Sequence, residues 1–312
     1  MKSSITFRNA YYIKLGRGGS WEEDSISKSL LRIGWSKYSL EDINSGRWSE
    51  IEKQLQIEHT GKPQVATTDF NRLRDIALST PDDIWITFHG AKMWWGRLAA
   101  GGVESDQLSK FRRLEGKWSD KSLKGQLLVT SELPGKIAQL QGFRGTVCRV
   151  KETELLRRVL AGDRSPLALE ISAHRDHLAI AAKNAIEQLH WKDYETLVDL
   201  VFRDTGWIRV SILGQQVKGY DLELREPITE DKYLVQVKSQ ASWKDLQESV
   251  SQFFPNDTAG DYKKIFFVTH KPADDLLDAS DIPDYVDLIP PQQLANLVID
   301  AGLSRWLEEK VA

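Results

Sequence analysis

The pattern of apolar and polar positions predicts alternating helices and strands in the second half of the chain. From residue 186 to residue 202, apolar side chains recur every three or four positions, which predicts a helix, and Thr205-Gly206 closes it with a C-cap glycine. After this helix, three segments alternate between apolar and polar residues with a period of two. They predict strands at 207–213, 220–224 and 233–238.

The first half of the chain is predicted to be rich in strands. A hairpin that contains three tryptophans is expected at 83–99, and residues 110–151 alternate strands with turns. Gly162-Asp-Arg-Ser-Pro166 then breaks a helix predicted at 151–161. A length of 312 residues is about twice that of a typical domain. We therefore expect an α/β chain, α+β overall, whose domains are residues 1–161 and 176–312, joined by a linker at 162–175.

One face of the strand at 233–238 carries polar side chains that need an explanation. Because side chains alternate along a strand, Leu234, Gln236 and Lys238 share this face. Asp221 lies at the turn end of the preceding strand. Its carboxylate and the side-chain carbonyl of Gln236 are hard oxygen ligands of the kind that divalent cations prefer. The pattern indicates a metal site beside a lysine, an arrangement that suits hydrolysis of a phosphodiester.

The residues around this site resemble the core of the PD-(D/E)XK nucleases, in the Mrr-like branch where glutamine replaces the usual acid before x-Lys. Asp221 with Gln236-Val237-Lys238 is similar to the catalytic motif of the family, and Tyr194-Glu-Thr-Leu-Val198 is similar to its FE.LV helix. Lys218-Gly-Tyr-Asp221 departs from the family pattern, because it has one acid where the family often has two. The resemblance covers roughly residues 183–305 and includes strands at 264–269 and 286–289 and the helix that follows.

This resemblance implies a restriction-endonuclease-like αβ sandwich that cleaves double-stranded DNA with Mg²⁺ or Mn²⁺ as cofactor. Asp221, Gln236 and the main-chain carbonyl of Val237 would hold the cation. Lys238 would orient or activate the attacking water, and Glu195 would bind a second metal or its water. The resemblance also implies a homodimer, because a double-strand break needs two active centres.

Composition narrows the class of protein. Hydrophobic residues make up 41% of the chain and charged residues 28%, which is ordinary for a globular protein with a sizeable core. No apolar run approaches the roughly 18 residues of a membrane helix, and the start of the chain does not resemble a signal peptide. Cys148 is the single cysteine. We therefore expect a cytoplasmic protein without membrane association, an internal disulfide or a zinc site.

Charge divides unevenly between the two halves. The formal net charge is −3, but residues 1–165 hold 27 Lys and Arg against 20 Asp and Glu, whereas residues 166–312 hold 15 against 25. This asymmetry indicates that the N-terminal half binds phosphate and the C-terminal half cuts. The strongly basic segment 110–151 supplies the candidate phosphate-binding residues, which are Arg112, Arg113, Lys117 and Arg144.

The N-terminal half also concentrates tryptophan, with seven of the eleven before residue 120. The segment 11–23, together with Arg32-Ile-Gly-Trp35 and the later segment from Trp85 to Arg97, is similar to EVE and other PUA-like domains, small β-barrels that read modified bases. An unrelated β-rich domain for DNA binding or dimerisation is the alternative. The loop Gly16-Arg-Gly-Gly19 is not a Walker motif, because no Gly-Lys-Ser/Thr ends it. We expect a base-binding pocket, with a modified cytosine as the recognised base. Its candidate residues are Trp21, Trp35 and Trp94.

Taken as a sequence, the chain is expected to be a Mg²⁺-dependent, modification-dependent DNA endonuclease of the restriction type, acting in antiviral defence. Two alternatives stay open. One is an effector nuclease that a small signalling ligand activates through the N-terminal domain. The other is a nucleic-acid-binding protein whose nuclease core is inactive.

Overall fold

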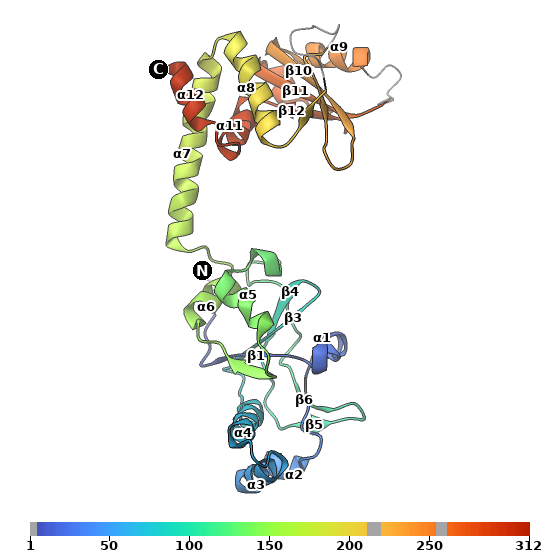
Figure 1. Cartoon of the computed structure of the whole chain (residues 1–312), viewed down its shortest axis with the longest axis vertical. Helices are drawn as coiled ribbons and strands as arrows, with labels where there is room; N and C mark the ends of the chain where they lie inside the picture. Colours follow the sequence, from blue (N-terminus) through green and yellow to red (C-terminus); the bar gives the residue numbers. More distant parts are fainter. Residues whose placement is uncertain (1–4, 211–219, 254–260) are drawn as a thin grey trace. The chain divides into compact units, whose positions relative to one another are not determined.

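The computed structural model describes residues 5–210, 220–253 and 261–312. The chain forms two compact units, Met1–Pro166 and Leu167–Ala312, and each has its own sheets and core (Figure 1). The expected linker, 162–175, consists of the four residues between helix α6 (Thr153–Ala161) and helix α7 (Pro166–Gln188) and the first ten residues of α7. Gly162 caps α6 with a φ of 73°, a left-handed conformation that glycine adopts without strain.

The N-terminal unit contains two open sheets. Its strands are β1 (Ala10–Ile13), β2 (Leu30–Ile33), β3 (Ile84–His89), β4 (Lys92–Gly96), β5 (Glu104–Ser105), β6 (Lys110–Arg113) and β7 (Val147–Arg149). The four-stranded sheet has the order β4-β3-β1-β7, and the three-stranded sheet has the order β2-β6-β5. In the first sheet, β1 pairs with β3 in parallel and with β7 in antiparallel orientation.

Helices take up much of the remaining N-terminal unit. They are α1 (Glu22–Lys28), α2 (Leu40–Ser45), α3 (Trp48–Glu58), α4 (Pro63–Ala77), α5 (Gly135–Ala138) and α6. Both faces of the four-stranded sheet are buried, as the alternation along β1 shows. Tyr11 and Ile13 join a core that includes α3 and α4, whereas Ala10 and Tyr12 join a second core that includes α5 and α6.

The expectation of a β-rich PUA-like barrel is not met by the described part of this unit. Its strands form two sheets, which are linked by an isolated bridge between Leu98 and Leu114, and they do not close into a barrel. The unit is also less rich in strands than expected: β1 and β3 are parallel neighbours, so the chain must cross over between them, and the segment between them includes α1 to α4. The segment 110–151, expected to alternate strands with turns, contains β6, β7 and the short helix α5.

The C-terminal unit is built on one five-stranded sheet. Its strands are β8 (Ile208–Arg209), β9 (Leu222–Arg225), β10 (Lys232–Ala241), β11 (Tyr262–Pro272) and β12 (Val286–Ile289), in the order β12-β11-β10-β9-β8. The pairs β10–β11 and β11–β12 are parallel, and the pairs β8–β9 and β9–β10 are antiparallel. The predicted strands are thus confirmed, although part of the first one, 211–213, lies outside the described residues.

Helices cover both faces of this sheet. They are α7, α8 (Trp191–Asp204), α9 (Trp243–Phe253), α10 (Asp274–Leu277), α11 (Pro291–Asp300) and α12 (Ser304–Val311). Figure 1 shows α8 and α11 on one side of the sheet and α9 on the other. The apolar stripe predicted for α8 is its buried face. Among the residues described, no helix has the length and hydropathy needed to span a membrane.

Candidate active site

Asp221 immediately precedes β9 and is fixed against the neighbouring strand β10. Its backbone N–H donates to the carbonyl oxygen of Val235 at 3.0 Å. Its carboxylate oxygen Oδ2 accepts two hydrogen bonds, from Gln236 Nε2 at 2.7 Å and from the backbone N–H of Val237 at 2.7 Å. The residues that the sequence singled out therefore meet where β9 begins beside β10.

Gln236 lies on the face of β10 that the period of two predicted. Leu234 packs in the core on the α9 side, whereas Val235 packs in the core on the α8 side. The Gln236 side chain is only 7% exposed, so its amide needs a partner, and the Asp221 carboxylate provides one. An amide carries both a donor and an acceptor, and half a turn of the group exchanges them. The same side chain can therefore bond a carboxylate or offer its oxygen to a cation.

Lys238 supplies positive charge on the same face of β10. Its side chain is half-buried, and its positive charge opposes the effect of burial, which raises the pKa of Asp221. The pKa of Asp245 is lowered mainly by hydrogen bonds from Ser242 and to a smaller extent by the Lys238 charge. Asp245 belongs to a reciprocal cap at the start of α9, where Ser242 N–H donates to its carboxylate at 2.8 Å. Within the described residues Lys238 forms no ion pair at close range. Its ammonium therefore stays available to an anionic group in the site.

Glu195 on α8 is electrostatically coupled to Asp221. Burial raises the pKa of the Glu195 carboxyl, the charge of Asp221 raises it further, and Lys192 opposes both effects. The Asp221 carboxyl also has a raised pKa because of burial, although the Val237 N–H and the Lys238 charge lower it. Both residues are nevertheless exposed to solvent. Two electrostatically coupled carboxyl groups with raised pKa values are typical of a functional site.

The residue before Glu195 anchors α8 to the sheet. The Tyr194 ring is buried and stacks on His270 of β11, with 4.4 Å between ring centroids. His270 Nε2 lies 2.6 Å from the carbonyl oxygen of Ile186 in α7, and burial lowers the pKa of its imidazole. A neutral imidazole can donate from Nε2 to that carbonyl, so the contact ties α7, α8 and β11 together. This anchoring determines where Glu195 is presented.

Two of the predicted phosphate-binding arginines are occupied by protein groups. Arg112 is 2% exposed, and its guanidinium donates to the carbonyl oxygens of Ile76, Ala77, Ser79 and Ala99. It therefore caps the end of α4 from the interior and cannot reach a phosphate. Arg113 is exposed, but it forms an ion pair with Glu104 at 2.8 Å.

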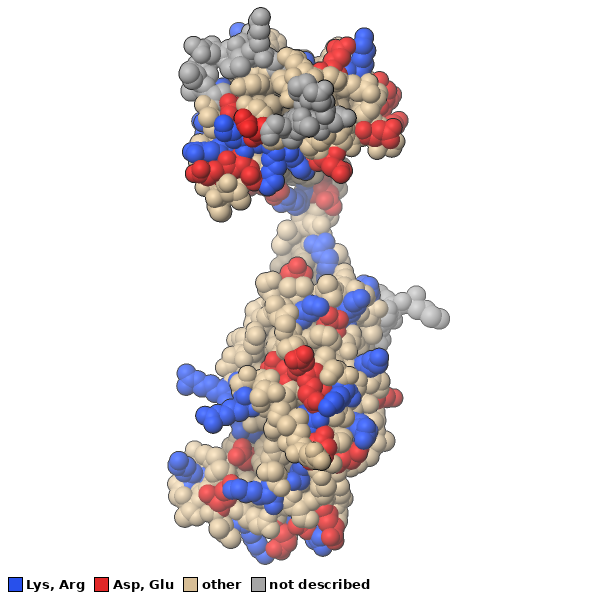
Figure 2. All heavy atoms as spheres, turned by 90° about the vertical axis from the view of Figure 1, so that its right-hand side faces the viewer, with Lys and Arg blue, Asp and Glu red and all other residues tan. Residues whose placement is uncertain are grey.

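The other two predicted phosphate-binding residues, Lys117 and Arg144, are exposed. Neither forms an ion pair within the described residues. On the face shown in Figure 2, basic and acidic side chains of the N-terminal unit are interspersed. The basic side chains on this face are therefore partly offset by neighbouring acidic side chains.

The structure does not bring the three candidate tryptophans together. Trp21 lines a cavity with Arg144, whereas Trp35 lines a separate hollow with Tyr38 and His59. Trp94 packs in the hairpin, and its indole N–H donates to the carbonyl oxygen of His89 at 3.1 Å. Trp94 and Trp95 point to opposite faces of β4, and because both faces of the sheet are covered, each of these side chains is half-buried.

Sequence reasoning missed Lys14, Arg17 and Thr146, which line the same cavity as Trp21. The available signal was the glycine-rich loop around Arg17. Gly16, Gly18 and Gly19 all have positive φ angles, of 82°, 65° and 84°. Because glycine adopts these angles without strain, the backbone of this loop can form part of the cavity wall although the loop is not a P-loop motif.

A comparison with protein families matches residues 186–298 to a family model described as Mrr_cat, Restriction endonuclease. The matched segment begins in α7, ends in α11, and contains Glu195, Asp221, Gln236 and Lys238. No curated protein matches the chain.

Two solved structures are similar at low identity. "DNA modification-dependent restriction endonuclease AspBHI" is 12% identical, covers 73% of this chain and 68% of its own, and has a TM-score of 0.33. "MspJI Restriction Endonuclease in Complex with 27-mer Oligonucleotide" is 13% identical, covers 92% and 74%, and has a TM-score of 0.28. The family match assigns the domain: residues 186–298 form a restriction endonuclease domain. Such a domain is typical of DNA-cleaving enzymes of the restriction type.

Proposed function

We propose that the chain is a Mg²⁺-dependent endonuclease, with Mn²⁺ as an alternative cofactor, that hydrolyses phosphodiester bonds in double-stranded DNA. The observation that carries the proposal is the Asp221 carboxylate, which Gln236 and Val237 hold in place within the matched domain. Lys238 and Glu195 bring the charges that complete the arrangement.

The available donors fit a hard divalent cation. Asp221 and Glu195 offer carboxylate oxygens, Gln236 an amide oxygen, and Val237 a backbone carbonyl, all of the type that Mg²⁺ binds. The pKa of both carboxyls is raised, so a bound cation that offsets their charge would lower it again. When bound, the cation would polarise a phosphate oxygen and make a water molecule more acidic.

The residues of the chain prepare the site for a phosphate group. The two N–H donors on Asp221 Oδ2 hold the carboxylate in one orientation, which pre-organises the site. The Lys238 ammonium would offset the negative charge that develops on the phosphate during attack by water. Because it forms no close ion pair within the described residues, it need not break one to do so.

Plasmid cleavage tests this proposal. Asp221→Ala and Lys238→Ala should each abolish Mg²⁺-dependent cleavage and leave DNA affinity within a few fold, because both residues act on charge in the transition state. Lys244→Ala is the matched control, since Lys244 is an exposed lysine on α9 that pairs with Glu248. Wild-type turnover in either site variant would contradict the assignment. A wild-type chain that binds DNA but never cuts it with Mg²⁺ or Mn²⁺ would support an inactive core.

Recognition belongs, in this proposal, to residues 1–161, and cleavage to residues 176–312. The N-terminal unit would bind DNA through unpaired cations, so its affinity should fall as salt rises, by about 0.9 in log K per log salt for each phosphate contact. The enzyme would act in the cytoplasm as a homodimer and respond to modified cytosine. Matched DNA with and without cytosine modification tests this response, because discrete fragments from modified DNA alone are the expected result.

A further inference from the structure

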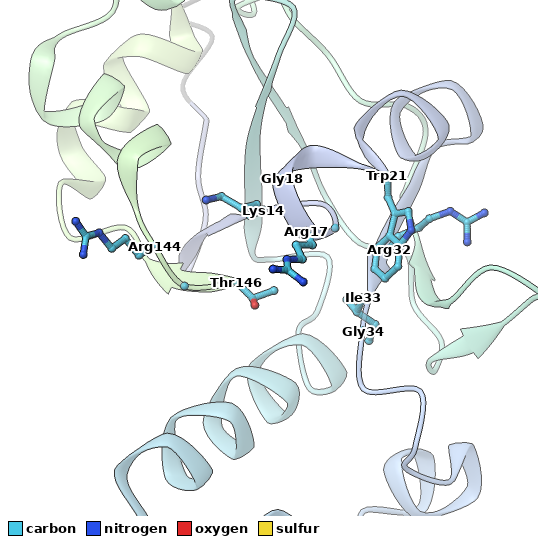
Figure 3. A pocket seen from close by; sticks show the side chains of 11 residues that line it. Lys14, Arg17, Gly18, Trp21, Arg32, Ile33, Gly34, Arg144 and Thr146 are labelled. Atoms are coloured by element: carbon cyan, nitrogen blue, oxygen red, sulfur yellow. The ribbon is translucent and has the colours of Figure 1, made fainter. Parts of the chain in front are cut away.

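The N-terminal unit contains a cavity of about 360 Å³ where several separate segments converge (Figure 3). It is lined by the loop after β1, the end of β2 and the segment before β7. The antiparallel pairing of Ile13 with Val147 explains the convergence, because it places the exit of β1 beside the entry of β7. The backbone N–H of Lys14 donates to the carbonyl oxygen of Thr146 at 2.8 Å and extends this pairing to the edge of the cavity.

Positive charge dominates the lining. Among the described residues, those that line the cavity include Lys14, Arg17, Arg32 and Arg144 and no carboxylate. Arg32 is 1% exposed, and its guanidinium is bound to Asp24 and Asp106, so it supports the wall and is not free to bind a ligand. In Figure 3 its guanidinium points away from Arg17.

Three cations remain for a ligand. Arg17 and Arg144 are exposed and, in the part of the chain that the structure describes, make no ion pair or side-chain hydrogen bond. Lys14 donates one bond, to the carbonyl oxygen of Phe143 at 3.1 Å, which leaves two of its N–H groups. The cavity therefore presents uncompensated positive charge, which calls for an anion.

The opposite wall is aromatic and apolar. The Trp21 side chain is half-buried and packs against the core beside Ile33 and Gly34. Figure 3 shows the Trp21 ring and the Arg17 guanidinium facing the same space. The loop that carries them is held by its own bonds: Trp21 N–H donates to the carbonyl oxygen of Leu15 at 3.1 Å, and Gly19 N–H to that of Gly16 at 3.3 Å. The cavity thus exists before a ligand arrives.

We propose that this cavity binds a nucleotide, with its base against Trp21 and its phosphate at Arg17 and Arg144. An aromatic face stacks any base, and arginine suits phosphate because its planar guanidinium can donate two parallel hydrogen bonds. The volume lies near the lower end of the roughly 300–1,000 Å³ typical of small-ligand sites, so it suits one nucleotide and not an extended strand.

The nucleotide could come from two sources, a free nucleotide or one residue of a DNA strand turned out of its stack. The chemistry of recognition is the same for both, and the experiment separates them. Nucleotide binding at this cavity does not depend on the proposed cleavage chemistry. The binding experiments below therefore contain EDTA, which removes the metal ions that cleavage would need. Loss of cleavage and loss of nucleotide binding are therefore distinguishable.

The test uses the full chain and compares Arg17→Glu with Lys62→Glu. Lys62 is exposed, lies outside the cavity and forms no ion pair within the described residues, so it matches the charge change. Trp21→Ala removes the stacking surface, and Trp21→Phe keeps an aromatic ring if the alanine variant fails to fold. Each 2′-deoxynucleoside 5′-monophosphate is titrated by calorimetry, and a short labelled duplex, unmodified or with 5-methylcytosine, is titrated by fluorescence polarisation.

We expect Trp21→Ala to weaken binding by about five- to hundred-fold, which corresponds to a stacking contribution of roughly 1–3 kcal/mol. Arg17→Glu should weaken binding at least as much, whereas Lys62→Glu and Trp21→Phe should stay within a few fold of wild type. Binding of a monophosphate with this pattern supports a free nucleotide. The same pattern in duplex binding alone supports a residue of DNA. Equal losses in Arg17→Glu and Lys62→Glu, or no loss with either class of probe, would overturn the proposal.

Discussion

Gln236→Glu is expected to destabilise the metal-free protein and to increase the stabilisation that Mg²⁺ gives. In the structure the Gln236 amide nitrogen donates to Asp221 Oδ2 at 2.7 Å. Glutamate would replace this donor by a second carboxylate oxygen at a place where burial already raises the pKa of Asp221. The substitution turns an attraction into a repulsion and keeps the length of the side chain.

The size of the effect follows from Coulomb's law. Two unit charges about 4 Å apart repel by roughly 4 kcal/mol at an effective dielectric constant of about 20, and by about 1 kcal/mol in bulk water. Asp221 is exposed to solvent whereas Gln236 is buried, so the expected penalty lies between these limits. For a unit of this size, each 1 kcal/mol lowers Tm by roughly 2–4 °C, so a fall of about 2–15 °C is expected.

Thermal unfolding with EDTA and with Mg²⁺, at mildly alkaline and at acid pH, measures the effect. At acid pH one of the two carboxyls binds a proton, so the difference from wild type should shrink. Mg²⁺ should raise Tm more for Gln236→Glu than for wild type, because the cation meets an additional negative charge. Gln240→Glu is the control, since Gln240 is an exposed glutamine of the same strand. The reasoning fails if both substitutions change Tm equally, or if Mg²⁺ stabilises Gln236→Glu no more than wild type.

Three further predictions concern the same two units. Asp221→Asn should abolish cleavage but stabilise the metal-free protein at neutral pH. The pKa of Asp221 is raised in the folded protein, so the wild type loses stability as pH rises from the ordinary carboxyl pKa through this raised value. Denaturation of both proteins with EDTA over a range of pH measures the difference in their stability. The cleavage rate should fall at low pH, with an inflection above the ordinary carboxyl pKa, because Asp221 and Glu195 must ionise. At a higher Mg²⁺ concentration this inflection should move to lower pH, because the cation competes with protons for the carboxylates. Arg112→Met should destabilise the N-terminal unit by about 3 kcal/mol or more, because it leaves buried carbonyls without donors, whereas Arg113→Met should cost about 1 kcal/mol or less in chemical denaturation.

The nuclease unit was predictable because its important contacts follow from local pattern. A period of two places Leu234 and Gln236 on one face of β10 wherever the strand lies, and the structure confirms it. A period near four places the apolar stripe of α8 on the sheet. What the pattern could not give is the orientation of the Gln236 amide, which depends on how Asp221 is placed opposite it in the paired strand.

The N-terminal unit shows why charge and aromatic content alone are poor guides to a binding surface. Arg112 and Arg17 are the same residue type, yet Arg112 is buried in the structure whereas Arg17 is exposed. Arg112 lies on β6, the central strand of its sheet, and the strand directs it into the interior, where backbone carbonyls bind it. Arg17 lies in a glycine loop where the chain leaves β1, and no acidic residue lines the space it faces. Only the pairing of β1 with β7, more than a hundred residues apart, brings Arg17 and Arg144 to the same cavity. A basic side chain is available to a ligand where the backbone holds it away from the acidic side chains and carbonyl groups of the protein. Its position depends on how distant strands are connected, which the local sequence pattern does not show.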